Sequence, residues 1–203
     1  MTIRGVLFDF DGTLTCPGAL DFPAIKAELG CPPDQPILEF LETRPWNRRK
    51  DLLRILAQKE DMAAGASSPN RGAVDCLSRL KKQGVPIGIL TRNSLSSIIK
   101  ALLKFEGVSI HDFKTLITRE VVALPKPGPD GVLEAARQMG LLPSEILVVG
   151  DFRFDVMAGK AAGAHTAFLT NGGISAVSAG DDQPDYIIGH LEEMIDILEL
   201  PTE

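Results

Sequence analysis

Short apolar runs alternate with amphipathic segments along much of the chain. Apolar runs rich in branched and aromatic residues predict six buried strands, at residues 3–9, 85–90, 113–117, 146–149, 165–169 and 186–188. Segments with apolar residues three and four positions apart predict helices at residues 71–83, 94–104, 128–139, 156–162 and 191–198. This alternation predicts an α/β protein with a mostly parallel sheet that is covered by helices on both faces.

The stretch from residue 16 to residue 69 follows a different pattern. Prolines break it repeatedly between positions 17 and 45, and it contains no strand-like run. Helices are predicted at residues 21–29 and 48–63, with Asn47 as the N-cap of the longer one, and residues 36–43 add at most a turn or two. Residues 16–69 are therefore predicted to form a small helical insert, and residues 1–15 and 70–203 the sheet domain that carries it.

Composition fits a protein of this kind. The 203 residues are 44% hydrophobic and 24% charged, as in globular domains. A net charge of −6 argues against nucleic acid as a partner. Three cysteines at irregular spacing indicate neither a disulfide framework nor a metal site, which favours the cytoplasm. We expect no signal peptide and no membrane span, because no apolar run approaches the ~18 residues of a spanning helix. The oligomeric state stays open.

Two aspartates, Asp9 and Asp11, follow the first predicted strand, and Gly12 ends it. Ligands of an open α/β sheet bind at this edge. One carboxylate can attack phosphorus as a nucleophile, and the other, kept partly protonated by its charged neighbour, can protonate the leaving oxygen. Such a pair can equally cap a turn or a helix. A calcium loop is excluded, because it needs an Asp or Asn at Thr13 and a Gly at Leu14.

Two further segments bring polar residues to the same edge of the sheet. Thr91, Arg92 and Asn93 follow the second strand, where a hydroxyl and the free N–H groups of a helix start can bind an anion. Lys126 stands between two prolines that restrict its backbone, so its cation can be held near carboxylates and a phosphate. The simpler alternatives are a helix cap for Thr91 and a solvated surface side chain for Lys126.

The fourth predicted strand ends in acidic residues. Asp151 stands at its tip, and Asp155 lies one helical turn further on. Carboxylate oxygens are the ligands that Mg²⁺ prefers. Asp155 could instead be a first-turn residue that the helix dipole stabilises, whereas an unpaired charge at a buried strand tip would be costly for Asp151.

These motifs together resemble those of the haloacid dehalogenase superfamily of hydrolases. Residues 9–14 resemble its first motif in the phosphatase form, and Thr91 is placed like its second. Residues 126–129 are similar to the third motif of the phosphoglycolate-phosphatase-like branch, and residues 150–155 are similar to the fourth.

This resemblance implies a Rossmann-like, doubly wound sheet with a small α-helical cap inserted after the first strand. It implies a magnesium site whose ligands are Asp9, the backbone carbonyl of Asp11, Asp151 and Asp155. It also implies that Asp9 is the nucleophile, that Asp11 is the acid and base, and that Thr91 and Lys126 hold the phosphoryl group. The implied reaction is hydrolysis of a small-molecule phosphomonoester through an aspartyl phosphate.

Two departures from the family pattern limit which residue roles can be transferred to this chain. Phe152 stands where the fourth motif often has a small hydroxyl residue, and the cap interval is shorter than in much of this branch. A phosphomutase of the same superfamily and a non-catalytic module that binds a phospho-ligand remain alternatives, whereas a dehalogenase would not need Asp11. In the insert, Arg48 and Arg49 could bind a second anionic group of the substrate, although a solvated basic face is the simpler interpretation. The identity of the phosphate ester stays open.

Overall fold

The computed structural model describes residues 2–173 and 183–199. Within these residues, six strands form one parallel sheet in the order β3-β2-β1-β4-β5-β6. The strands are β1 (Gly5–Phe8), β2 (Ile87–Leu90), β3 (Thr115–Ile117), β4 (Ile146–Gly150), β5 (His165–Leu169) and β6 (Tyr186–Ile188). The predicted Rossmann-like, doubly wound α/β fold is confirmed. The strand order reverses between β1 and β4, and ligands of such sheets bind in the crevice at that point.

The strands are continuous apolar runs in the sequence because both of their faces are buried. Every residue of β1, β2 and β4 is buried, because helices cover both faces of the sheet. The predicted strands at residues 85–90 and 113–117 each begin two residues later than expected, since those first residues complete the preceding turns. The sheet therefore lies in the middle of the molecule, and only its carboxyl edge is available for polar chemistry.

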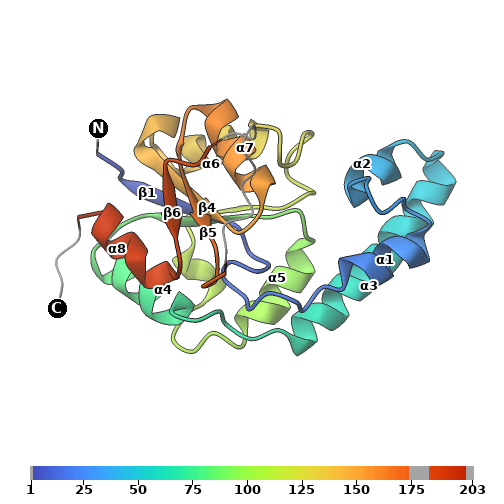
Figure 1. The fold of residues 1–203 in the computed structure, drawn as a ribbon, viewed down its shortest axis with the longest axis horizontal. Helices are drawn as coiled ribbons and strands as arrows, with labels where there is room; N and C mark the ends of the chain where they lie inside the picture. Colours follow the sequence, from blue (N-terminus) through green and yellow to red (C-terminus); the bar gives the residue numbers. More distant parts are fainter. Residues whose placement is uncertain (1, 174–182, 200–203) are drawn as a thin grey trace.

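The α-helices of the described residues fall into three groups. They are α1 (Phe22–Leu29), α2 (Ile37–Glu42), α3 (Trp46–Ala66), α4 (Ala73–Lys82), α5 (Leu95–Leu102), α6 (Asp130–Met139), α7 (Arg153–Ala162) and α8 (Met194–Ile197). Short 3₁₀ turns occupy Ile110–Asp112, Pro143–Glu145 and Leu191–Glu193. Helices α4, α5 and α8 pack on one face of the sheet, and α6 and α7 pack on the other (Figure 1).

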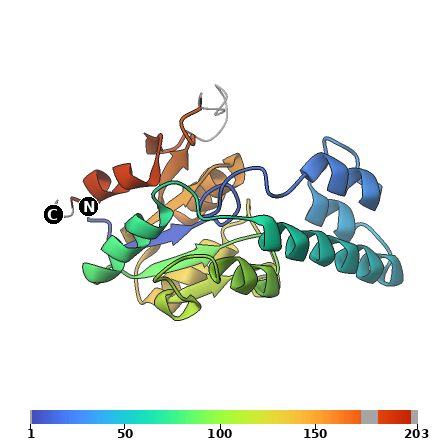
Figure 2. The ribbon, with the colours of Figure 1, turned by 90° about the horizontal axis from the view of Figure 1, so that it is seen from below.

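Helices α1, α2 and α3 form the third group, which we call the helical arm (residues 20–66). The arm extends to one side of the sheet (Figures 1 and 2) and has an apolar core of its own, with Ile25, Phe40 and Leu52 among its buried side chains. The chain leaves and re-enters the sheet side by side, because the backbone N–H of Cys16 donates to the carbonyl of Ser68 at 2.9 Å. The arm is thus joined to the sheet through this paired connection, and its helix α3 also packs against α5 of the sheet domain.

The start of α3 corrects one prediction. Asn47 is not the N-cap: the cap residue is Pro45, with φ −55° and ψ 146°, and Asn47 lies within the first helical turn. Proline at this boundary fixes its own φ and has no N–H, so the helix can begin directly after it. The helix also runs three residues past the predicted end at position 63, because Ala63, Ala64 and Ala66 favour helix.

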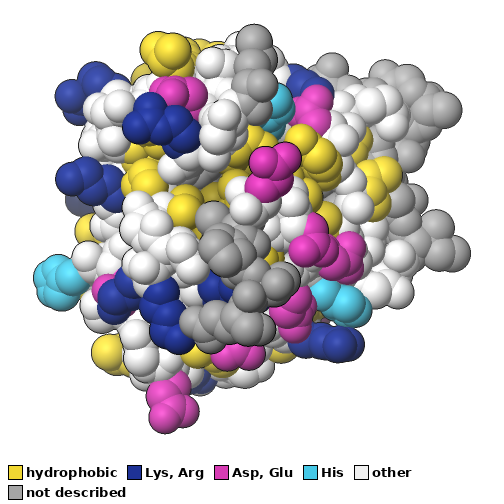
Figure 3. Space-filling model, turned by 90° about the vertical axis from the view of Figure 1, so that its left-hand side faces the viewer, with side chains coloured by type: hydrophobic (Ala, Val, Ile, Leu, Met, Phe, Trp, Pro, Cys, Tyr) yellow, Lys and Arg dark blue, Asp and Glu magenta, His cyan; other side chains and the backbone are white. Residues whose placement is uncertain are grey.

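Two surface findings complete the description. No helix in the described part of the chain has both the length and the apolarity needed to cross a bilayer. On the face opposite the helical arm, Lys and Arg side chains lie beside Asp and Glu side chains in several places (Figure 3).

Candidate active site

The turn after β1 places two aspartates at the carboxyl edge of the sheet. The backbone N–H of Asp9 donates to the carbonyl of Val149 at 2.8 Å, so the pairing with β4 continues one residue beyond the strand. Gly12 then takes a φ of 76°, and a Cβ atom there would overlap the Asp151 carboxylate. Glycine therefore permits both the positive φ and the close approach of the fourth motif to the first. As a result, Asp9 and Asp11 line the same cavity.

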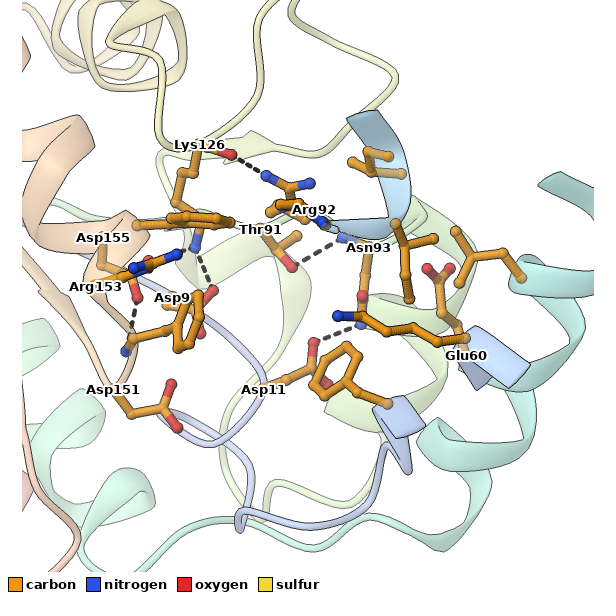
Figure 4. Close-up of a pocket in the computed structure, with 18 of the residues that line it drawn as sticks. Asp9, Asp11, Glu60, Thr91, Arg92, Asn93, Lys126, Asp151, Arg153 and Asp155 are labelled. Carbon is orange, nitrogen blue, oxygen red and sulfur yellow. Dashed lines mark hydrogen bonds and ion pairs between the residues drawn. The ribbon is translucent and has the colours of Figure 1, made fainter. Parts of the chain in front are cut away.

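Lys126 joins the first motif to the fourth. Its Nζ atom lies 2.5 Å from Oδ1 of Asp9 and 2.5 Å from Oδ1 of Asp155, and the side chain is 5% exposed (Figure 4). Burial opposes a charge on this lysine, but the carboxylates of Asp155 and Asp9 outweigh burial and raise the pKa of Lys126 above its ordinary value. Lys126 is therefore a buried cation shared by the first and fourth motifs, and its predicted contact with a phosphoryl group stays a prediction.

Asp9, Asp151 and Asp155 form a carboxylate cluster. One oxygen from each lies within 4.8 Å of the others. Burial and repulsion between the carboxylates raise the pKa values of Asp151 and Asp155 above the ordinary range. Lys126 brings one positive charge to three carboxylates, and carboxylate oxygens are the donors that a hard divalent cation takes. The cluster therefore fits a divalent metal ion.

Asp11 has a different environment. Its Oδ2 atom accepts a hydrogen bond of 2.5 Å from the side-chain amide of Asn93. Burial, followed by the charges of Asp9 and Glu60, raises the pKa of Asp11 to about 7. A carboxyl group with this pKa can act as both acid and base near neutral pH. Its carboxylate is not part of the cluster of three, and the predicted metal contact through its backbone carbonyl stays a prediction.

The segment after β2 contributes Thr91, Arg92 and Asn93 to the cavity. The hydroxyl of Thr91 is buried and accepts a hydrogen bond of 3.1 Å from the Asn93 backbone, so its own proton can point to a phosphate. The Asn93 side chain donates to Asp11 and also lines the cavity, and its predicted contact with substrate stays a prediction. Arg92 donates to the Lys126 carbonyl and holds Glu39 of α2 in a bidentate ion pair at 2.9 and 2.5 Å. Arg92 therefore links the helical arm to the edge of the sheet.

Arg48 and Arg49 lie elsewhere. Arg48 is exposed in the first turn of α3, and the Nη2 atom of Arg49 lies 3.9 Å from an Oε1 atom of Glu42. In the part of the chain that the structure describes, neither side chain lines the cavity. Their predicted contact with substrate stays a prediction that this geometry does not favour.

Glu60 of α3 is a site residue that the sequence reasoning missed. It lines the cavity, is only 3% exposed, and pairs with the Arg119 guanidinium, which is 10% exposed. Its other oxygen accepts a hydrogen bond of 3.3 Å from the Ser94 backbone. Burial raises the pKa of Glu60 although Arg119 opposes this. Its spacing could have identified it, because Glu60 follows Leu56 by four residues and therefore lies on the buried face of the helix.

Two asparagines that the sequence reasoning also missed donate hydrogen bonds to backbone carbonyls of the first motif. The side-chain amide of Asn70 donates to the carbonyl of Thr13 and to the side chain of Asn171, each at 2.8 Å. Asn171 in turn donates to the carbonyl of Gly12 at 2.8 Å. These bonds satisfy buried carbonyls of the turn and fix its shape. Lone asparagines in loops carry no signal that distinguishes this role.

The cavity itself has a volume of about 500 Å³ and lies between the sheet edge and the helical arm (Figure 4). Its polar residues are those described above together with Lys26, Asp34 and Arg153. Its other lining residues include the apolar side chains of Phe22, Ile37, Leu38, Leu56, Phe152 and Phe154. Phe152, which departs from the usual fourth motif, therefore faces the place where a substrate would bind.

Comparison with known proteins agrees with this geometry. The sequence profile of the haloacid dehalogenase-like hydrolases matches residues 3–163, so the chain belongs to this family of hydrolases. An uncharacterized hydrolase of Saccharomyces cerevisiae is 32% identical over 177 residues, which cover 83% of this chain and 78% of the yeast protein. The phosphoglycolate phosphatase of Escherichia coli K12 is 28% identical over 238 residues, which cover 98% of this chain and 94% of that enzyme.

The fold is shared as well. The crystal structure of a hydrolase from Pseudomonas syringae superposes with a TM-score of 0.78 at 20% sequence identity, and the match covers 98% of this chain and all of that one. This likeness concerns the fold alone. The family match makes the chain a hydrolase, and the phosphatase among its relatives supports its assignment as a phosphatase.

Proposed function

We propose that this protein is a Mg²⁺-dependent phosphomonoester hydrolase that acts on a small phosphorylated metabolite through an aspartyl phosphate. The observation that carries the proposal is the convergence of Asp9, Asp11 and Lys126 at one end of a single cavity. These residues combine a nucleophile, a carboxyl group with a raised pKa and a buried cation. The relative named as a phosphoglycolate phosphatase supports a small phosphate ester as the substrate class.

The first step transfers the phosphoryl group to the protein. Because Lys126 holds Oδ1 of Asp9, the Oδ2 atom is the one that attacks phosphorus, and the bond from phosphorus to the ester oxygen breaks. The departing alkoxide takes the proton of Asp11, which is protonated in a large fraction of molecules at neutral pH. Lys126 and the hydroxyl of Thr91 stabilise the negative charge on the phosphoryl oxygens.

The second step regenerates the site. Asp11, now ionised, takes a proton from a water molecule, and the hydroxide attacks the phosphorus of the aspartyl phosphate. The bond from phosphorus to Asp9 breaks, which releases inorganic phosphate and restores the carboxylate. Asn93 keeps Asp11 in place during both proton transfers. Each turnover therefore consumes one ester and one water and leaves both aspartates in their starting states.

The carboxylate cluster supports magnesium as the cofactor. Asp9, Asp151 and Asp155, with the backbone carbonyl of Asp11, would hold the ion. When bound, Mg²⁺ offsets the repulsion between the phosphate and the carboxylates and polarises a phosphoryl oxygen. The role of this chain is to keep three acidic side chains close together, with Lys126 between two of them.

We also infer that residues 16–69 act as a cap on a core of residues 1–15 and 70–203. The separate apolar core of the helical arm and its paired connection support this division. A cap of this kind excludes water from the reaction and completes the site when it closes.

The variant Asp9→Asn tests the proposed function. The wild-type protein should release inorganic phosphate from phosphomonoesters with Mg²⁺ present and should stop when a chelator removes the metal. Asp9→Asn should lower kcat by at least roughly 10⁴-fold, because no other group replaces the nucleophile. Asp75→Asn, which makes the same change at an exposed position in α4, is the matched control and should keep wild-type activity.

Two results would contradict the proposal. One is an Asp9→Asn protein that still hydrolyses phosphomonoesters at the wild-type rate. The other is a wild-type protein that moves phosphate between hydroxyl groups of a sugar phosphate without releasing inorganic phosphate, which would define a phosphomutase.

A further inference from the structure

The cavity has two chemically different ends. One end contains the carboxylates, Lys126 and Thr91. The other, which we call the apolar end, is lined by Phe22, Ile37, Leu38 and Leu56 of the helical arm and by Phe152 and Phe154 at the start of α7, with Lys26, Asp34 and Arg153 among them. If the phosphate binds at the polar end, the remainder of the substrate, which becomes the leaving alcohol, lies against the apolar end.

Two of these side chains are unusually exposed for phenylalanine. Phe22 is 51% exposed at the first position of α1, and Phe152 is 53% exposed at the cap position of α7. Both rings line the same cavity, one from the arm and one from the core. Phe152 is held in orientation by Phe154, with ring centroids 4.9 Å apart and an interplanar angle of 82°. A bound ring would remove both apolar surfaces from water.

Two of the cationic side chains beside the apolar end already have partners, whereas Arg153 is exposed and its guanidinium carbon lies 5.5 Å from the centroid of the Phe154 ring. The Nζ atom of Lys26 donates to the carbonyl of Pro33 at 2.6 Å, and Arg92 is engaged by Glu39. A ring placed against these phenylalanine and leucine side chains buries apolar surface without leaving hydroxyl groups unpaired.

The cavity also has room for more than a phosphate, because its volume of about 500 Å³ lies within the usual range of small-molecule sites, roughly 300–1,000 Å³. The phosphate ester of a two-carbon acid would fill only the polar end. A ring attached to the ester oxygen would reach the apolar lining as well.

We propose that the preferred substrate is a phosphomonoester whose leaving alcohol carries an aromatic ring, bound between Phe22 of the arm and Phe152 of the core. The inference rests on the proposed function for the place of the phosphate. It also gives Phe152 a role: the position that is often a small hydroxyl residue elsewhere in the family here supplies one wall of the ring-binding end.

Binding of phosphonates tests the substrate class without requiring turnover. Calorimetric titration with Mg²⁺ present should show that benzylphosphonate binds about tenfold more tightly than methylphosphonate, which has the same anionic group and no ring. Phe152→Ser and Phe22→Ala should each reduce this preference by about three- to tenfold. Trp46→Ala removes a ring that is 72% exposed and does not line the cavity, and it should leave the preference unchanged.

The matching kinetic experiment compares 2-phenylethyl phosphate with ethyl phosphate, two esters of alcohols of similar acidity. The ring should raise kcat/KM by about tenfold in the wild-type protein, and Phe152→Ser should remove most of that gain. Both phenylalanines are exposed, so unfolding temperatures equal to that of the wild type will verify that the variants fold.

Equal affinity for the two phosphonates would overturn the inference, and so would a preference that survives in Phe152→Ser and Phe22→Ala alike. An inactive Asp9→Asn protein together with equal phosphonate affinities would refute the aromatic leaving group and leave the proposed phosphatase activity standing. An active Asp9→Asn protein together with a preference for benzylphosphonate would refute the proposed mechanism and leave the binding site for the ring standing.

Discussion

The edge of the sheet and the helical arm line the same cavity with opposite kinds of surface. At the sheet edge Asp9, Lys126 and Asp155 are charged and buried, and Lys126 holds the two carboxylates in place. The arm contributes mainly apolar side chains, and Phe22 remains half exposed. Fixed charges suit a reaction that needs one geometry, whereas an apolar wall suits selection among leaving groups. On the proposed function, the sheet edge supplies the reacting groups, whereas the arm supplies most of the apolar wall and Phe152 of the core completes it.

The two regions are joined by ion pairs of unequal burial. Glu60 and Arg119 are 3% and 10% exposed, so their pair lies away from solvent. Glu39 and Arg92 are 39% and 19% exposed, so their pair is partly screened by water. We therefore expect the Glu60 pair to contribute to the fixed geometry of the site and the Glu39 pair to contribute little to stability.

The largest effect is expected at the sheet edge, from Lys126→Met. Removal of the buried cation leaves the carboxylate cluster uncompensated, so the free energy of unfolding in a chelator should fall by about 3–5 kcal/mol. The loss of charge stabilisation should lower kcat by roughly 10²–10³-fold. Urea denaturation with and without Mg²⁺ measures the first effect, and Mg²⁺ should restore part of the lost stability. Lys100→Met, which breaks an exposed pair with Asp61, is the control and should change stability by less than about 1 kcal/mol.

A substitution that creates a void in the apolar core of the arm should have the next largest effect. It should show whether the arm and the sheet unfold separately. Leu52 is 1% exposed among the apolar residues of the arm. Leu52→Ala should cost about 2–5 kcal/mol. If the arm is a separate unit, hydrogen exchange should speed up in α1, α2 and α3 while β1 and β4 keep their protection. Equal acceleration in β1 would show instead that arm and sheet unfold as one body.

The variant Glu60→Gln tests the role of the buried ion pair between the arm and the sheet domain. Glutamine can still accept the hydrogen bond from the Ser94 backbone, but it loses the charge that pairs with Arg119. We expect stability to fall by about 1.5–3 kcal/mol and the pKa of Asp11 to fall slightly, since the Glu60 charge helps to raise it. The alkaline limb of the pH profile of kcat/KM, where the first step loses the protonated form of Asp11, should therefore move to lower pH. An unchanged profile alongside the loss of stability would reduce Glu60 to a structural role.

The smallest effect is expected at the exposed link. Burial alone would raise the pKa of Glu39, but the hydrogen bonds from Arg92 reverse this and place it below its ordinary value of 4.5. A lowered pKa means that the pair stabilises the folded state above pH 4.5 and that this contribution is lost as the pH falls through the Glu39 pKa. Glu39→Gln should thus cost about 0.5 kcal/mol at pH 7, after solvent screening, and progressively less below pH 4.5. Urea titrations of both proteins at several pH values measure the difference.

Much of the fold and part of the site could be predicted because the signals are local. The apolar run of β1 ends at Asp9, and parallel strands bring their carboxyl ends to one edge, so the approximate positions of Thr91, Lys126 and Asp151 follow from the order of the strands. Errors were confined to the ends of elements. Asn47 was predicted as an N-cap because it has a suitable side chain, whereas Pro45 set the start of α3 through its backbone.

The sequence by itself determined which chemistry this protein carries: a carboxylate pair after a buried strand, a lysine between prolines, and two further acids after β4. Only the tertiary structure decided how those groups are held. Asn93 meets Asp11, Glu60 meets Arg119, and the rings of Phe22 and Phe152 line one cavity. The physical reason is that hydrophobic periodicity depends on neighbours a few positions away, whereas contacts between residues dozens of positions apart exist only after the strands and the arm have packed.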